Sequence, residues 1–451
     1  GELSDKLVVG RIEEIAEHPD ADRLRVCKVD VGRARKLTIV CGAANARQGL
    51  YTIAALVGAE LPAGIIISKA AVRGVTSSGM LCSASELGLE ESSSGILELA
   101  GNLLPGTPAS EILQLDDKII DLELTPNRGD CLSMRGVARE VAALTGSRLK
   151  KPVKAIEMDV QAKARLPVKL TASDGCPHYV GRIIRAVDVK AETPLWMKER
   201  LRRAGIRSLG ACVDVTNYVM LELGQPMHAF DLAQLDSYIE VRYANGKEEL
   251  ALLDGSTIKP ETTDLLITDK SGPLALAGVM GGAVSAVSDQ TQDIFLESAF
   301  FSPEIIAVTS RDRGVRSDSS HRFERGVDFQ LHHVSIERAS LLLTEIAGGL
   351  CGPIIEKTIN SKLPRKEPIL LRKERLNALL GTAITGRQMI SSLQKLDMQL
   401  SCKTKNDTVR VTAPSYRYDI CIEADLIEEV ARVTGFEKIP ELAPLARIQS
   451  G

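Results

Sequence analysis

Aromatic side chains are scarce in this sequence of 451 residues, where phenylalanine, tyrosine and tryptophan together make up 3% and tryptophan occurs once. Aliphatic side chains must therefore fill the hydrophobic cores. Neither sign of charge dominates, because 56 lysines and arginines stand against 59 aspartates and glutamates, for a formal net charge of −3. Small DNA-binding domains are usually strongly basic. The balance argues against a DNA function, and any contact with nucleic acid must come from local basic patches.

Cysteine pairs and long apolar runs are also missing. The nine cysteines include no C-x-x-C pair and no Cys/His cluster, which argues against a zinc site and a disulfide framework and is typical of a reducing compartment. Charge, proline or glycine interrupts the most apolar stretches, 49–68 and 272–288, so neither is expected to span a membrane. The chain opens at Gly1 without a secretion signal. We therefore expect a cytoplasmic protein without a membrane segment.

The length predicts several domains, and we expect a multidomain α+β protein. Residues 1–112 contain short β-branched stretches broken by glycines, the pattern of an OB-type β-barrel. Residues 113–165 hold one helix and a connector, and 166–355 mix helices with strands. Residues 362–440 have the order helix, helix, two strands, helix, which suits a small winged-helix-like domain. Expected strands are 7–15, 24–31, 36–40, 51–61, at least two within 238–268, 398–402 and 408–412; expected helices are 134–144, 194–204, 328–347, 373–380, 386–396 and 423–434.

Four short segments near the N-terminus combine turns with basic residues: 9–12 (VGRI), 18–26 (HPDADRLRV), 39–45 (IVCGAAN) and 72–83 (VRGVTSSGMLCS). Turns rich in glycine and serine expose backbone N–H groups that can bind phosphate, and OB barrels use such loops and one sheet face to bind nucleic acids. Ordinary turn chemistry explains each segment taken alone. Together, in this order and spacing, they resemble the tRNA-binding OB domain of the bacterial phenylalanyl-tRNA synthetase β-subunit family.

This resemblance implies that the first domain binds tRNA. The candidate contact residues in the four segments are Arg23, Arg25, Asn45 and Arg73. Proteins that read single strands usually stack the bases on aromatic side chains, which are rare here. We therefore expect contacts with the tRNA backbone or elbow.

A second set of segments lies in the middle of the chain: 214–218 (DVTNY), 222–231 (ELGQPMHAFD), 277–282 (AGVMGG), 295–299 (FLESA) and 311–328 (RDRGVRSDSSHRFERGVD). Each has a structural alternative: a lone histidine near proline is more often structural, glycines serve tight turns, and the arginines of 311–328 could form a solvated ion-pair loop. Together these segments resemble the editing domain of the same family. That domain hydrolyses tRNA(Phe) wrongly charged with tyrosine.

The resemblance implies an editing pocket around His228 and Glu297, with Gly281 and Gly282 in one wall. Tyrosine exceeds phenylalanine by one hydroxyl, so a buried carboxylate can favour tyrosine by accepting its hydrogen bond. We assign that role to Glu297. His228 would orient or help to activate the hydrolytic water, or position the ester. In the closing loop the family commonly reads T-D-A-S-H-R, whereas residues 317–322 here read SDSSHR, so the pocket candidates Ser317 and Ser319 differ.

A third set of residues is acidic. On the helix expected at 423–434, apolar residues point inward and leave Asp425, Glu428 and Glu429 on one outer face, with Asp419 six residues upstream of Asp425. Carboxylates suit a hard ion such as Mg²⁺. The alternative is a solvated acidic face with Arg432 paired to Glu428 or Glu429. The segment resembles the family's magnesium-associated module, which implies that the four carboxylates hold Mg²⁺ beside the α subunit.

The resemblance covers essentially the whole chain and implies its partners. In this family the α subunit uses ATP to charge tRNA(Phe) with phenylalanine within an α₂β₂ tetramer, so we expect no synthetic site and no bound ATP in this chain. Residues 321–324 (HRFE) imitate the Arg-x-Glu element of class II synthetase sites but lack the accompanying motifs. Family members extend beyond both ends, which implies a truncated chain. Two alternatives stay open: a non-catalytic tRNA-binding scaffold, and a Mg²⁺-dependent hydrolase or phosphotransferase that uses the four carboxylates.

Overall fold

The computed structural model describes residues 3–114, 117–149, 158–404 and 408–441. Contacts divide the chain into two compact units, one of Gly1–Asp121 with Pro194–Arg203 and one of Leu122–Thr193 with Ala204–Gly451. Among the described residues, no helix combines the length and the apolar character needed to cross a membrane.

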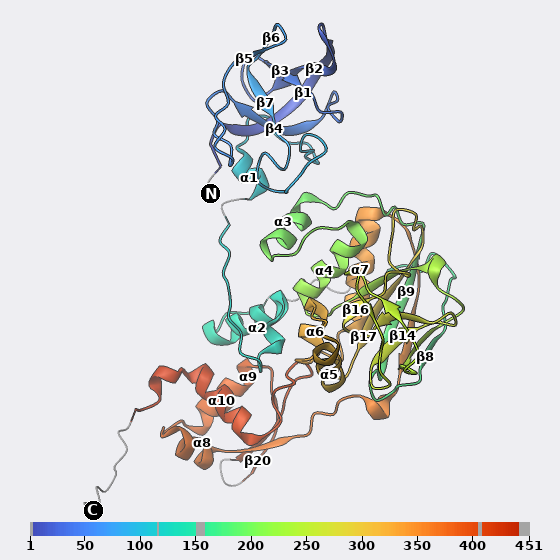
Figure 1. Ribbon diagram of the computed structural model, residues 1–451. Coiled ribbons are helices and arrows are strands. Elements are labelled where there is room, and N and C mark those ends of the chain that lie inside the picture. Colours follow the sequence, from blue (N-terminus) through green and yellow to red (C-terminus); the bar gives the residue numbers. More distant parts are fainter. Residues whose placement is uncertain (1–2, 115–116, 150–157, 405–407, 442–451) are drawn as a thin grey trace, which may run out of the picture. The chain divides into compact units, whose positions relative to one another are not determined.

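The first unit is a nearly closed, barrel-like antiparallel sheet (Figure 1) in the order β3-β2-β1-β4-β7. The long strand β1 pairs with β4 through its first residues and with β2 through the rest, so it joins both halves of the sheet. The elements of this unit are β1 (Leu7–His18), β2 (Ala21–Asp30), β3 (Leu37–Cys41), β4 (Tyr51–Leu56), β5 (Ala70–Val72), β6 (Val75–Ser77), β7 (Gly79–Leu81), α1 (Ala109–Leu113) and α3 (Leu195–Arg203).

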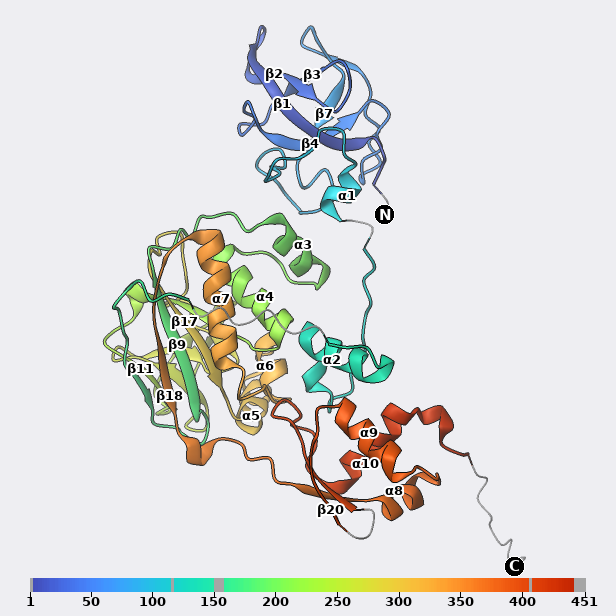
Figure 2. The same ribbon diagram turned by 180° about the vertical axis from the view of Figure 1, so that it is seen from behind.

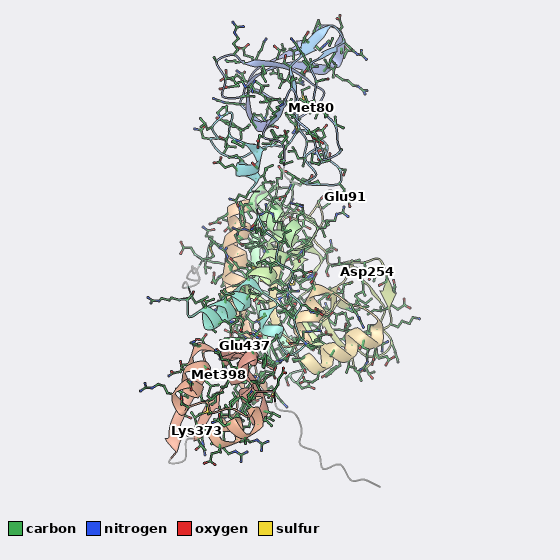
Figure 3. The ribbon with its side chains drawn as sticks, turned by 90° about the vertical axis from the view of Figure 1, so that its left-hand side faces the viewer. Met80, Glu91, Asp254, Lys373, Met398 and Glu437 are labelled. Atoms are coloured by element: carbon green, nitrogen blue, oxygen red, sulfur yellow. The ribbon has the colours of Figure 1, made fainter. Side chains whose placement is uncertain are left out.

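Two hydrophobic clusters fill the first unit, and their buried members are aliphatic side chains and cysteines. Met80 of β7, labelled in Figure 3, packs against one of them. The scarcity of aromatics is thus reflected directly in this core. The four predicted strands occur, with shifted ends: β1 continues to His18, and β4 ends at Leu56 because the chain turns at Gly58, whose φ is +84°.

The middle of the second unit contains two larger sheets, in the orders β10-β17-β9-β18 and β16-β15-β14-β11-β8, and a two-stranded sheet of β12 and β13. One hydrophobic cluster draws on both larger sheets. Helices α4 and α7 pack together, and α7 packs on β17 and β9 (Figure 2). The elements are β8 (Val168–Leu170), β9 (His178–Arg185), α4 (Ala211–Leu223), β10 (His228–Asp231), η2 (Leu232–Gln234), β11 (Ile239–Tyr243), β12 (Leu250–Ala251), β13 (Thr257–Ile258), β14 (Leu265–Thr268), β15 (Pro273–Leu276), β16 (Met280–Gly281), β17 (Ile294–Phe300), α5 (Pro303–Arg313), α6 (Asp318–Phe323), α7 (His332–Ala347) and β18 (Leu350–Thr358).

Sequence patterns predicted this region only in outline. The strands expected between 238 and 268 are present as β11 to β14, whereas helices α4, α5 and α6 were not anticipated. Helix α7 begins at His332 and not at residue 328, because Asp328 forms a turn in which its carboxylate accepts the N–H of Gln330 and its carbonyl accepts that of Leu331.

The C-terminal part of the second unit packs three helices against a three-stranded sheet in the order β19-β21-β20. Strand β19 was missed, so the predicted two-stranded arrangement is corrected to three. Helices α8 and α10 and strand β21 have the predicted bounds. The elements are η3 (Asn360–Lys362), β19 (Ile369–Arg372), α8 (Lys373–Leu380), α9 (Gly386–Lys395), β20 (Gln399–Thr404), β21 (Thr408–Thr412), α10 (Glu423–Thr434) and η4 (Phe436–Lys438).

Before the middle region in the sequence, η1 (Gly129–Cys131) leads into α2 (Met134–Thr145). The helix starts where the Ser133 hydroxyl accepts the N–H of Gly136, and it ends at Gly146 in the left-handed conformation. Both signals are local, and the sequence predicted both ends. Its apolar stripe is only partly buried, since Met134 is 69% exposed and Val141 is 51% exposed.

Candidate functional site

His228 and Glu297 lie directly opposite each other on the antiparallel strands β10 and β17. Residues opposite each other on neighbouring strands point to the same face of the sheet. On the other side of β17, Gly181 of β9 is the partner of Glu297. A side chain at this position would collide with the Phe295 ring, because a Cβ would lie 2.3 Å from Phe295 Cζ. The face that carries His228 and Glu297 is therefore tightly packed with aromatic rings.

Glu297 is a buried carboxylate in largely apolar surroundings, with 5% of its surface exposed. Tyr179 donates a hydrogen bond to its Oε2 atom at 2.7 Å. Burial raises the pKa of Glu297 to about 7, and the Tyr179 hydrogen bond opposes that rise. Both protonation states of Glu297 are therefore accessible near neutral pH.

His228 presents a neutral imidazole. Its Nε2 atom is buried and has no hydrogen-bond partner within the described part of the chain. The ring stands edge-on to Phe230, with centroids 4.4 Å apart. Burial lowers the pKa of His228 to about 4, because the charged form loses its hydration. A neutral ring nitrogen without a partner can accept a hydrogen bond from a ligand or a water molecule.

The glycine-rich turn at 277–282 contacts His228 at one position, Gly281. A Cβ on Gly281 would lie 2.5 Å from His228 Cε1, so only glycine permits this approach. Gly282 serves the sheet itself, since a Cβ there would lie 2.3 Å from the Leu274 carbonyl oxygen. The structure thus places Gly281 against the imidazole and Gly282 against the backbone of β15.

Ser317 and Ser319 hold this turn in place. Ser317 caps α6, and its hydroxyl donates to the Val279 carbonyl at 2.6 Å. Ser319 donates to the Gly278 carbonyl at 3.0 Å. Both hydroxyls therefore donate to backbone carbonyls of the turn and hold it in place.

Tyr179 is the site residue that the sequence motifs did not indicate. It lies in β9, outside every segment that carries the family resemblance, and 118 positions separate it from Glu297. Its signal in the sequence was only a tyrosine in a strand-like stretch, and such a residue is ordinarily assigned to the core.

The predicted tRNA-binding residues lie in the first unit. Arg23 and Arg25 are exposed on β2, and Arg73 is exposed at the tip of the β5–β6 hairpin with a φ of +43°. This tip lies beside the β1–β2 turn, because His18 Nε2 is 3.1 Å from the Val72 carbonyl oxygen. The exposed arginines thus belong to neighbouring hairpins.

Asn45 is partly buried and forms hydrogen bonds within the first unit. Its Nδ2 atom donates to the Ile96 carbonyl at 2.9 Å and to Glu98, and its Oδ1 atom accepts the N–H of Ile96 at 3.1 Å. The side chain therefore links two segments of the barrel, while its contact with tRNA stays a prediction.

The four acidic residues at α10 do not form the expected outer face. Glu429 is buried, with 2% of its surface exposed, and it accepts hydrogen bonds from Arg417 at 2.6 Å and from Arg432 at 2.8 Å. Arg417 is equally buried and also binds Asp419 at 2.7 Å. The expectation that Glu429 shares a solvent-facing side with Asp425 is wrong, because the guanidinium of Arg417 draws it inward.

The remaining members of the acidic set have separate surroundings. Asp425 accepts the N–H groups of Cys421 and Ile422 at the start of α10. Glu428 is exposed and lies 3.5 Å from the Asn127 amide. Within the described ranges, no group of three or more His, Cys, Asp or Glu side chains is placed to hold a metal ion. Because two of the four carboxylates bind one arginine, the residues as arranged do not fit a Mg²⁺ site.

Comparisons with known proteins match this organisation. Three family models match the chain: a putative tRNA binding domain at residues 7–108, a B3/4 domain at 175–348 and a tRNA synthetase B5 domain at 369–436. An N-terminal fragment of the phenylalanyl-tRNA synthetase β subunit from Pyrococcus horikoshii aligns at 15% identity with a TM-score of 0.33, covering 68% of this chain and 84% of that one, which is too weak a likeness to indicate a shared fold.

Much stronger similarity is found to proteins named phenylalanine–tRNA ligase beta subunit. Those of Nitrosococcus oceani and Methylococcus capsulatus are 50% identical over 440 residues and 51% identical over 439 residues, and each alignment covers 97% of this chain. The relative from Aromatoleum aromaticum is 52% identical over 439 residues. The chain spans about half the length of these relatives, 55% in each case. With three matched domains in one order and half of the aligned residues identical, the chain belongs to the phenylalanine–tRNA ligase β-subunit family.

Proposed function

We propose that this chain binds tRNA(Phe) and proofreads it by hydrolysing the ester of tRNA(Phe) wrongly charged with tyrosine. It would act in the cytoplasm as part of the β subunit, while the α subunit uses ATP to attach phenylalanine. The observation that carries the proposal is the pairing of His228, which is half-buried with a buried Nε2 atom, with the buried Glu297 opposite it on β10 and β17, and the close approach of Gly281 to the imidazole.

Recognition of tyrosine falls to Glu297. Tyrosine differs from phenylalanine by one hydroxyl, which an apolar pocket alone distinguishes poorly. The Tyr179 hydroxyl engages Oε2 of Glu297, and Oε1 has no hydrogen-bond partner within the described residues. A tyrosyl hydroxyl can donate to that oxygen, whereas a phenylalanyl ring would bury the acceptor without a partner. The buried carboxylate therefore favours the wrongly attached amino acid.

His228 is suited to holding the hydrolytic water. General-base catalysis is most efficient when the pKa of the base lies near the working pH. The pKa of His228, about 4, makes the imidazole a weak base that stays neutral at pH 7, and in the tautomer with the proton on Nδ1 its Nε2 atom accepts hydrogen bonds. Its free Nε2 atom would orient the water, whose oxygen bonds to the ester carbonyl carbon. As the bond from that carbon to the tRNA 3′ oxygen breaks, the proton of the water passes to this oxygen, and tyrosine and the free 3′ hydroxyl are released.

Binding of the tRNA would use Arg23, Arg25 and Arg73 of the first unit. Their exposed guanidinium groups suit phosphate oxygens, which bind arginine in a sequence-independent manner. The net charge of −3 means that these local arginines, and not the overall field, attract the RNA.

The test is deacylation of Tyr-tRNA(Phe) by the chain and by its His228→Ala and Glu297→Ala variants. We expect hydrolysis by the unaltered chain and a strong loss in His228→Ala. His333→Ala is the matched control, because His333 is half-exposed and pairs with Glu356 outside the pocket. If the unaltered chain binds tRNA but releases tyrosine no faster than buffer, hydrolysis is wrong and the scaffold alternative stands.

A further inference from the structure

Tyr179 is held rigidly beneath Glu297. Its side chain is 0% exposed, and its ring stacks on Phe295 with centroids 6.4 Å apart and an angle of 13° between the planes. Strand β9 lies between β17 and β18, so β9 cannot move without disturbing hydrogen bonds on both sides. The phenolic hydroxyl is therefore fixed at 2.7 Å from Glu297 Oε2.

We propose that Tyr179 determines the tyrosine selectivity of the pocket by occupying one carboxylate oxygen of Glu297 and orienting the other toward the incoming tyrosyl hydroxyl. This inference rests on the proposed editing function and assigns Tyr179 as a positioning residue.

The carboxylate of Glu297 would be free to rotate without an anchor. A glutamate side chain has a broad torsional preference at its last bond, so an unanchored carboxylate in an apolar pocket could turn and present either oxygen. Tyr179 is the one hydrogen-bond partner of the Glu297 side chain among the described residues. A charged group accepts such a bond more strongly than a neutral one. The bond therefore selects a single orientation of the acceptor.

The anchored carboxylate presents its other oxygen, Oε1, to a ligand. With Oε2 engaged by the chain itself, one oxygen remains for a ligand donor. A pocket preorganised in this way gains from a tyrosyl hydroxyl without first reorienting the carboxylate. Phenylalanine has no hydroxyl to fill the remaining position. Binding of the correct aminoacyl group therefore leaves a buried acceptor without a partner, which weakens that binding.

The hydrogen bond from Tyr179 also affects the protonation of Glu297. The titratable groups beside Glu297 are Tyr179 on β9, the buried Cys176 thiol ahead of β9, and His228 on β10. The Tyr179 hydrogen bond lowers the pKa of Glu297 against the effect of burial. Without that bond, the carboxyl group of Glu297 would be protonated over a wider pH range. In that form it is a weaker acceptor for the tyrosyl hydroxyl.

The experiment replaces Tyr179 by phenylalanine, which keeps the ring and removes the donor. Deacylation rates of Tyr-tRNA(Phe) and Phe-tRNA(Phe) are measured across the pH range around the Glu297 pKa of about 7. We expect the ratio of the two rates to fall by about tenfold or more, and the pH midpoint of the selectivity to move upward. Tyr243→Phe is the matched control, because the Tyr243 hydroxyl donates to an exposed carboxylate, Asp174, at 2.8 Å.

A mere packing role would leave both the ratio and the midpoint of Tyr179→Phe unchanged, and that result overturns the inference. Combining Tyr179→Phe with Glu297→Ala supplies a second readout, since the effect of Tyr179 on selectivity should disappear when position 297 has no group to accept its hydrogen bond. Equal effects in both backgrounds also overturn the inference. A chain that never hydrolyses Tyr-tRNA(Phe), whatever residue stands at position 179, instead contradicts the proposed function.

If Tyr179→Phe does not fold, an ortho-fluorinated tyrosine at the same position keeps the hydroxyl and makes it a stronger donor. The pH midpoint of selectivity should then move downward. An unchanged midpoint in this folded variant would show that the Tyr179 hydroxyl does not act on Glu297.

Discussion

His228 stands opposite Glu297 because β10 and β17 pair in one antiparallel register. A slip of one residue would turn one of the two side chains to the other face of the sheet. Phe230 and Phe295 form the next pair on the same face, and both are fully buried, so the hydrophobic core itself holds the register. The packing of two phenylalanines thus keeps a histidine and a carboxylate together.

Gly281→Ala should impair hydrolysis while the chain still folds. The new Cβ would lie 2.5 Å from His228 Cε1, so the imidazole must move away from its position. We expect the deacylation rate to fall by about tenfold or more, since small misplacements of catalytic groups have large effects. Gly42→Ala is the control, because its Cβ would meet only the flexible end of Leu24 at 3.3 Å. Full activity of Gly281→Ala would contradict the placement of the turn.

Glu297→Gln should change how stability depends on pH. The pKa of Glu297 is raised from 4.5 to about 7 in the folded chain. Between these values the folded state binds more protons than the unfolded state, so the contribution of Glu297 to stability is present at low pH and is lost as pH rises through 7. The loss amounts to about 3 kcal/mol, and glutamine does not titrate.

The measurement for this prediction is urea unfolding of both proteins at several pH values. The glutamine variant should gain stability relative to the unaltered chain as pH rises from below 4.5 to above 7. A constant difference between the two proteins over this range would show that the Glu297 pKa is not raised.

Arg417→Met should strongly destabilise the second unit. Arg417 and Glu429 are each 2% exposed, so removing the guanidinium leaves buried carboxylates with fewer partners. Breaking one side of a buried ion pair costs about 3–5 kcal/mol. Lys259→Met is the control, because the Lys259–Glu249 pair is exposed and such pairs contribute about 1 kcal/mol or less. Equal unfolding midpoints in urea for the two variants would refute the role of Arg417.

Removal of divalent metal should leave hydrolysis and thermal stability unchanged. The arrangement around Arg417 does not fit a Mg²⁺ ion, and the proposed chemistry uses no metal. Deacylation and the unfolding temperature are measured with EDTA and with added Mg²⁺. Loss of hydrolysis in EDTA would favour the Mg²⁺-dependent hydrolase, and a Mg²⁺-induced rise in Tm that Glu428→Gln abolishes would restore the magnesium prediction.

Replacing Arg23, Arg25 and Arg73 together by glutamine should weaken tRNA binding and its dependence on salt. For every phosphate that the variant no longer neutralises, the slope of log K against log salt should decrease by about 0.7–0.9. Binding is measured by titration at several salt concentrations. Arg47→Gln is the control, because the exposed Arg47 side chain is already paired with Glu98 at 2.6 Å. An unchanged salt slope in the triple variant would place the tRNA on another surface.

Local signals in the sequence predicted a large part of the fold. Helix α2 lies within one residue of its predicted bounds, because the Ser133 hydroxyl caps its first turn and Gly146 adopts the left-handed conformation directly after its last residue. Helix α10 has its predicted bounds, and Leu426 and Val430 are buried as expected. Such features depend on residues a few positions apart, so the sequence carries them directly. Family motifs likewise led to His228 and Glu297, which the structure brings together.

Tertiary structure decided the contacts that give these residues their chemistry. The spacing on α10 placed Glu429 outside, but Arg417, from the preceding loop, draws it into the interior. Tyr179 reaches Glu297 across 118 positions because β9 and β17 pair in one register. By itself the sequence determined the family, the main elements and the identity of the central pair. The pKa of each member and the partner of each carboxylate depend on burial and register, which arise only when distant segments pack together.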